Sequence, residues 1–88
     1  MQTIHWQQAE VLELEHTDEY IGVIEMQSTE KGLRCDVRLE DVHSDSSLII
    51  ATCLSKEYNI QELHDYAESV LQDEEYCESA WKHNCKIK

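Results

Sequence analysis

The sequence predicts an α+β fold, in which a three- to four-stranded antiparallel β-meander packs against a C-terminal acidic helix bent near Asp73. Apolar and polar residues alternate over residues 32–39, which is the period of a strand. Polar turn segments separate the apolar runs of the first two thirds of the chain, as between hairpin strands. In the last third the apolar period becomes that of an amphipathic helix. We expect one small domain over residues 1–88.

The first strand is predicted at about residues 10–15. The apolar residues of this region share one parity: Ile4, Trp6, Leu12 and Leu14. Gln8 and Glu10 interrupt the alternation, so a backward extension of the strand requires a bulge around Gln7–Ala9. The polar residues 16–19 form the predicted turn into the next strand.

A β-hairpin follows. Residues 20–27 are rich in β-branched side chains, which favour a strand. Residues 32–39 alternate strictly and place four apolar side chains on one face: Leu33, Cys35, Val37 and Leu39. The polar segment 28–32 between them ends in Gly32, which takes a positive φ without steric cost.

A fourth strand is predicted at about residues 48–55. Its residues 48–54 form an almost unbroken apolar run, and the polar loop 43–47 leads into it. Because continuous apolar runs are typical of strands buried on both faces, we expect an inner strand of the sheet.

The first helix is predicted at about residues 60–72. Its apolar residues fall on one helical face: Ile60, Leu63, Ala67, Val70 and Leu71. Asn59, followed three residues later by Glu62, has the form of a capping box. The core is expected between this stripe and the odd-numbered face of the strand at 32–39.

A second helix is predicted at about residues 74–83. Continuing the first helix past Gln72 would bury Glu74 and Glu78, whereas Asp73 can cap a new helix. The new helix carries its own stripe of less polar side chains: Tyr76, Cys77, Ala80 and Trp81. We therefore expect a bend near Asp73.

The strongest functional signal is the acidic run from Glu57 to Glu78, which holds eight Asp and Glu residues without one Lys or Arg. The whole chain carries a formal net charge of −12, beyond the ~2–8 that solubility calls for. An acidic proteome would explain the total, but the clustering favours a use in binding, because the run forgoes Glu–Lys helix pairs worth ~0.2–0.5 kcal/mol each. Such a surface repels nucleic acid and anionic membranes and attracts basic grooves.

We expect no enzyme, no cofactor and no metal site. Gly22 and Gly32 are the only glycines, so the chain has no glycine-rich phosphate loop. Cys35 and Cys53 fall within predicted strands, away from any activating base. The group of Cys77, His83 and Cys85, with His64 as a possible fourth ligand, does not match the usual spacings of zinc ligands, and no EF-hand-like loop is present.

The expected compartment is the cytoplasm. The first residues have neither the basic start nor the apolar run of a signal peptide, and no segment approaches the ~20 apolar residues of a membrane span. The four cysteines are then most simply reduced thiols. The expected partner is a basic nucleic-acid-binding protein or ribonucleoprotein complex, bound by a monomer or homodimer, without direct contact to nucleic acid or membrane.

Arg34 and Arg38 are the only arginines, and they share the outward face of the strand at 32–39 with Asp36 between them. A local basic stripe is one interpretation. We favour pairing across strands with acidic neighbours, which stabilises the exposed face of a sheet.

In type, the chain resembles the small phage-encoded inhibitors of host defence, notably anti-CRISPR proteins and other DNA mimics. The hairpin at 20–39 and the acidic run 57–78 carry this resemblance. It implies binding in the basic nucleic-acid channel of a bacterial defence complex such as CRISPR-Cas, in the cytoplasm of the host cell, and no catalysis.

The alternative is an immunity-like, antitoxin-like or regulatory protein-interaction module anchored by Tyr66, Tyr76 and Trp81, because aromatic side chains dominate binding hot spots. Mimicry predicts binding that weakens steeply with salt, whereas aromatic anchoring predicts little salt dependence. The predicted partner-binding residues are Glu57, Glu62, Asp65, Tyr66, Glu68, Asp73, Glu75 and Tyr76.

Overall fold

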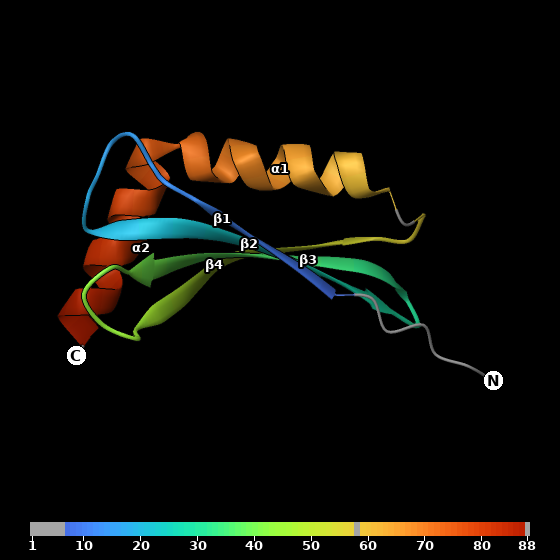
Figure 1. Ribbon diagram of the computed structural model, residues 1–88, viewed down its shortest axis with the longest axis horizontal. Coiled ribbons are helices and arrows are strands. Elements are labelled where there is room, and N and C mark those ends of the chain that lie inside the picture. The colour runs from blue at the N-terminus through green and yellow to red at the C-terminus, as the bar shows by residue number, and fades with distance from the viewer. Residues whose placement is uncertain (1–6, 58, 88) are drawn as a thin grey trace.

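A computed structural model describes residues 7–57 and 59–87, with side chains as far as His83. The elements are β1 (Gln7–Leu12), β2 (Tyr20–Thr29), β3 (Gly32–Asp41), β4 (Ser47–Ser55), α1 (Ile60–Gln72) and α2 (Glu74–Ile87). The strands form one antiparallel meander in the order β1-β2-β3-β4. Figure 1 shows α1 lying along one face of this sheet and α2 crossing it near the end where β3 stops and β4 starts. The α+β fold is therefore confirmed.

The core lies between the sheet and the two helices. The main buried residues are Tyr20, Ile24 and Met26 of β2, Leu33, Cys35, Val37 and Leu39 of β3, Leu63, Ala67 and Leu71 of α1, and Cys77 and Trp81 of α2. The predicted packing of the odd-numbered β3 residues against the α1 stripe is thus confirmed. Ile60 is the exception, since it begins α1 and stays half exposed.

Both glycines mark close approaches of the backbone. A Cβ atom on Gly22 would lie 2.8 Å from Leu71 Cδ1, so the missing side chain lets α1 sit close to β2. Gly32 has a φ of +141°, and a Cβ there would lie 2.4 Å from the Ser55 carbonyl oxygen. The predicted hairpin forms with a shorter turn than expected, because Thr29 already pairs with Gly32.

The predicted first strand is present as β1 at Gln7–Leu12, so it starts and ends three residues earlier than the predicted range of about 10–15. Its register against β2 is continuous, and the bulge proposed around Gln7–Ala9 is absent from this paired segment. The polar residues that break the apolar pattern have a different cause. β1 is an edge strand, and Glu10 lies at the rim of the sheet, where it meets His64 of α1.

β4 is also an edge strand, so the prediction of an inner strand was wrong. The residues of its apolar run divide between the buried and the exposed face of the sheet. Leu48, Ala51 and Cys53 pack against the core, whereas Ile49 and Leu54 remain 53% and 43% exposed. An unbroken apolar run therefore does not prove burial on both faces. A bulge at Ile50 interrupts the pairing of β4 with β3.

The bend at Asp73 is confirmed. Asp73 takes an extended conformation, its N–H donates to the Val70 carbonyl at 3.2 Å, and its carboxylate accepts the Tyr76 N–H at 3.1 Å. The same residue thus ends α1 and caps α2. α2 extends to Ile87, beyond the predicted end at residue 83, because no Gly or Pro stops it.

At the start of α1, the Asn59 side chain accepts the Glu62 N–H at 3.1 Å, as the capping box predicts. The Asn59 N–H donates instead to Ser55 Oγ at 3.1 Å, which ties the helix start to the end of β4. Among the described residues, no helix has the length and apolar character needed to cross a membrane.

Candidate functional site

The outer side of α1 and the first turn of α2 form an acidic surface. Four of the predicted binding residues lie exposed there or in the turn that precedes α1: Glu57, Glu62, Asp65 and Glu75. Within the described part of the chain, none of them forms an ion pair with a Lys or Arg. Asp65 accepts a hydrogen bond from Gln61 Nε2 at 2.8 Å, which leaves its charge uncompensated. These carboxylates can therefore meet a basic partner.

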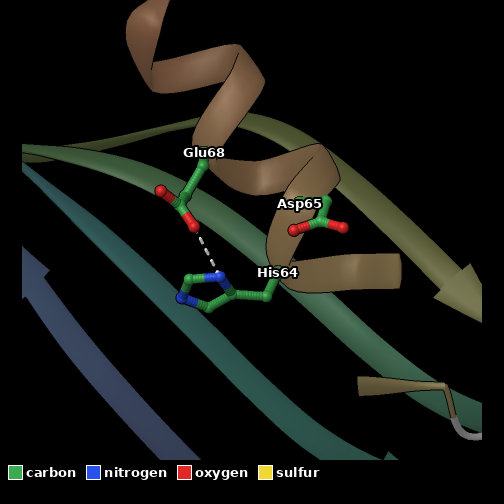
Figure 2. A group of neighbouring side chains, drawn as sticks. All are labelled: His64, Asp65 and Glu68. Carbon is green, nitrogen blue, oxygen red and sulfur yellow. Dashed lines mark ion pairs between the residues drawn. The ribbon is translucent and has the colours of Figure 1, made fainter. Parts of the chain in front are cut away.

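Two other predicted acids have structural contacts. Asp73 caps α2, as described above. Glu68 Oε1 lies 2.7 Å from His64 Nδ1, and Figure 2 shows this pair on one side of α1 with Asp65 set apart from it. Glu68 therefore has a partner within the fold, whereas Glu62 and Asp65 form no ion pair among the described residues.

His64 joins α1 to β1. Its Nε2 lies 3.3 Å from both carboxylate oxygens of Glu10, and its Nδ1 faces Glu68. Both ring nitrogens of His64 therefore lie within hydrogen-bonding or ion-pairing distance of a carboxylate, one from β1 and one from α1. The His64 ring therefore links α1 to the edge of the sheet at β1 through the carboxylates of Glu10 and Glu68.

A metal ion would find few free ligands here. His64, Asp65 and Glu68 each offer a ligand atom within 4.8 Å of the others. However, both nitrogens of His64 already face carboxylates, and the three side chains are exposed or half-buried. The group can attract cations through its charge, as any acidic surface does, without a formed coordination site.

An acidic groove of about 530 Å³ opens between the β1–β2 connection and the C-terminal half of α1. Four carboxylates line it, those of Glu13, Glu15, Glu68 and Glu74, together with three leucines. A Lys or Arg side chain of a partner could lay its aliphatic stem along the leucines and present its charge to the carboxylates. Glu13 and Glu15 were missed because they precede the acidic run. The alternation of Leu and Glu over residues 12–15 is the signal that could have indicated them.

Glu78, the last acid of the run, points inward. Its Oε1 accepts the Tyr20 hydroxyl at 3.1 Å, and His16 Nε2 lies 3.1 Å from the same hydroxyl oxygen. Burial, followed by the hydrogen bond and charge of Glu78, raises the pKa of Tyr20 well above its usual range. Tyr20 therefore stays a neutral donor inside the fold, and Glu78 does not belong to the acidic surface.

The aromatic residues divide into two groups. Trp81 is only 7% exposed and its ring lies 4.8 Å from that of Tyr20, so the prediction that it anchors a partner was wrong. Tyr66 and Tyr76 remain 38% and 45% exposed. The Tyr76 hydroxyl donates to the Ile50 carbonyl, which fixes its ring beside the bulge of β4.

Cys35 and Cys77 are buried, where nucleophilic chemistry is disfavoured. Burial raises the pKa of Cys35 to about 11, with a smaller effect of the Asp36 charge, and burial likewise raises the pKa of Cys77 to about 11. Cys35 lies directly opposite Cys53 in the sheet. The side chain of Cys85 lies outside the described part of the chain.

The open face of the sheet carries the two arginines. Arg38 Nε lies 2.9 Å from Glu25 Oε1 on β2, an ion pair without an aligned hydrogen bond. Arg34 Nε instead pairs with Asp36 of its own strand at 3.1 Å. Cross-strand pairing is therefore confirmed for Arg38 and wrong for Arg34. Each pair is partly exposed and contributes ~0–1 kcal/mol.

Comparisons of the chain with protein-family models, with curated proteins and with solved structures found no match. The molecule itself offers three distinct surfaces. The acidic surface covers the outer side of α1, the start of α2 and the groove beside β1. The open sheet face has paired charges, and the β4 edge is lined by uncharged side chains.

Proposed function

We propose that this protein is a non-catalytic acidic binding protein that occupies a basic, nucleic-acid-binding surface of a partner. The observation that supports it best is the set of exposed carboxylates on α1 and α2, which no Lys or Arg of the described chain neutralises. From Glu57 to Trp81 the sequence contains no basic residue except His64.

Electrostatics explains why such a surface would select this partner. Carboxylates three residues apart on a helix rise by ~4.5 Å, which is comparable with the ~3.4 Å between phosphates along a nucleic-acid strand. A channel whose Lys and Arg side chains receive phosphates can therefore receive Glu62 and Asp65, and Glu75 adds an exposed carboxylate in the first turn of α2. The acidic groove adds a place where one basic side chain of the partner can enter.

The most specific form of the proposal is a phage-type inhibitor that blocks a bacterial defence complex such as CRISPR-Cas in the cytoplasm of the host cell. The resemblance of a small acidic α+β chain to inhibitors of this type supports it. Binding would exclude nucleic acid by occupancy, so no reactive group is needed.

One observation favours a second candidate. Tyr66 and Tyr76 are exposed aromatic side chains beside the acidic surface, as an immunity-like, antitoxin-like or regulatory interaction module would present them. In that case the carboxylates would steer the approach of the partner, and the tyrosines would hold it.

The test is capture of partners from a bacterial lysate at low and high salt. The native protein is compared with the variant Glu62→Gln/Asp65→Asn/Glu75→Gln. The matched control, Asp18→Asn/Glu30→Gln/Asp45→Asn, removes the same charge from exposed positions outside the helices.

Mimicry predicts that the native protein and the control capture a nucleic-acid-binding complex, that added DNA or RNA releases it, and that the helix variant fails to capture it. Capture by all three proteins, insensitive to salt and lost in Tyr66→Ala or Tyr76→Ala, would instead favour the aromatic-anchored module. Equal losses in both charge variants would show that only the total charge matters.

A further inference from the structure

The two edges of the sheet are protected to different degrees. β1 spans six residues, carries Glu10, and has the charged Glu10–His64–Glu68 network beside it. β4 spans nine residues, Ser47–Ser55, and contains no charged residue and no proline. Charges on short edge strands prevent pairing with other chains, so β4 lacks a protection that β1 has.

The bulge at Ile50 protects only the first half of β4. It interrupts the pairing with β3, and the Tyr76 hydroxyl occupies the Ile50 carbonyl. Beyond the bulge, Ala51–Ser55 pairs regularly with β3. The described chain places no strand on the other side of this segment, so its outward backbone groups are available for pairing.

Exposed apolar and aromatic side chains border this segment. Leu54 and Ile49 lie on the open face of the sheet, and Tyr76 lies on the helix side. His64 and Glu68 lie on the side of α1 that faces β1. Tyr66 is two residues from each of them, which is ~200° around the helix, so it lies on the side of α1 nearer β4. The β4 edge thus combines free backbone groups with an uncharged border.

We propose that a second copy of this chain pairs antiparallel with Ala51–Ser55, so that the two meanders form one eight-stranded sheet. An antiparallel pairing of two identical edges about a two-fold axis is self-complementary. Within the described part of the chain, β4 is the only strand without charge and hence the only uncharged strand available to meet an uncharged edge.

Charge also selects this contact. Each copy carries a net charge of −12, and repulsion between exposed carboxylates acts over a screening length of ~8 Å. Contact through the acidic helices would bring these charges together, whereas contact through β4 brings together Ser, Thr, Cys and aliphatic residues. The acidic surface keeps its carboxylates exposed in such a dimer, so this inference does not rest on the proposed function.

Cys53 can report the contact. A two-fold axis within Ala51–Ser55 brings each Cys53 near its counterpart, since directly opposed Cβ atoms in a sheet lie ~4.5–5.5 Å apart. Cys35 and Cys77 are buried, and Cys53 is partly exposed. With Cys85 replaced by Ser, a short bismaleimide should link two copies through Cys53.

The test is sedimentation equilibrium of the full chain from about 1 µM to about 1 mM, a range that covers weak and moderate interfaces. The disrupting variant is Leu54→Lys and the matched control is Val11→Lys. Both residues are exposed on edge strands and both changes add one positive charge, so only their edges differ. Circular dichroism checks that each variant folds.

We expect a dimer for the native chain and for Val11→Lys. Leu54→Lys should weaken dimerisation by roughly tenfold or more, because the symmetry introduces the change twice at the contact. Bismaleimide should yield a linked dimer that Cys53→Ser abolishes. A native chain that stays monomeric throughout the range, or a dimer weakened by Val11→Lys and not by Leu54→Lys, would overturn the proposal.

Discussion

The two edge strands of the sheet, β1 and β4, differ in how far they are protected from pairing with another chain. Each leaves a row of backbone groups without a neighbouring strand among the described residues. At β1 the strand is short, and Glu10 draws His64 and Glu68 into a charged network. At β4 the strand is longer and uncharged, and Tyr76 closes only its bulge. Charged side chains thus protect the β1 edge, whereas the β4 edge remains able to pair with another strand.

The same comparison locates the acidic surface. The groove with Glu13, Glu15 and Glu74 lies on the β1 side of α1, and Glu62 and Asp65 lie on its outer side. The exposed tyrosines lie toward β4. The proposed binding of a basic partner through these carboxylates and the proposed pairing of two copies through β4 would therefore use different surfaces.

The largest expected effect comes from displacing β4. Gly32→Ala places a Cβ atom 2.4 Å from the Ser55 carbonyl at a φ of +141°, so the hairpin end and the end of β4 must move apart. We expect a loss of about 2–4 kcal/mol in the free energy of unfolding. Urea denaturation measures it, and Lys31→Ala in the same turn serves as the control that should change little.

The thiols measure how open the β4 edge is. Cys53 lies on β4, whereas Cys35 opposite it and Cys77 are buried with pKa values raised to about 11. In a Cys85→Ser background at pH 8, we expect DTNB to modify Cys53 faster than the other two, because Cys53 is partly exposed, whereas burial shields Cys35 and Cys77 and raises their pKa. Equal rates for the three thiols would contradict this placement.

The same thiols give a pH dependence. Because the folded-state pKa values of Cys35 and Cys77 exceed the ordinary value of 9.0, the folded state holds these protons more tightly. Their contribution is fully present below pH ~9 and is lost as the pH rises toward ~11. Urea denaturation between these pH values should show falling stability, with a smaller fall in Cys77→Ala after allowance for its lower starting stability.

Removing one hydroxyl should loosen the protected half of β4. Tyr76→Phe leaves the ring in place and deletes the hydrogen bond to the Ile50 carbonyl. We expect a loss of ~1 kcal/mol in stability and faster amide exchange around the bulge. Tyr66→Phe, whose exposed hydroxyl lies on α1, is the control. Equal effects of the two changes would show that the Ile50 contact contributes nothing of its own.

The smallest effect on stability is expected at the β1 edge. His64→Gln removes the imidazole that lies between the carboxylates of Glu10 and Glu68. We expect a loss of ~0.5–1 kcal/mol that shrinks with added salt, and faster amide exchange in β1. His43→Gln, in the exposed loop before β4, should leave both measurements unchanged. If the amide exchange rates in β1 stay the same in His64→Gln, His64 does not protect this edge.

Local patterns were sufficient for the elements whose burial depends on one period. The alternation from Leu33 to Leu39 predicted β3 and its buried face, and the stripe from Leu63 to Leu71 predicted α1. Asp73 was predictable because both a cap and a break in the apolar register point to it.

What the sequence could not decide depends on neighbours far along the chain. An apolar run such as 48–54 fits an inner strand and an edge strand equally, and the meander order decides between them. In the sequence, Glu10 interrupts the apolar alternation of the first strand. In the fold it contacts His64, which lies 54 residues later in the chain. From the sequence, Trp81 could face a partner or the core. In the fold it packs in the core against the ring of Tyr20. The groove needed Glu13 and Glu74, which only the fold brings together.

Amide hydrogen exchange of the native chain at low and high protein concentration tests the contrast between the edges most directly. If two copies pair through β4, protection of the amides of Ala51–Ser55 rises with protein concentration while protection of β1 stays constant. Protection that is independent of concentration at both edges, or that rises equally at both, would contradict it.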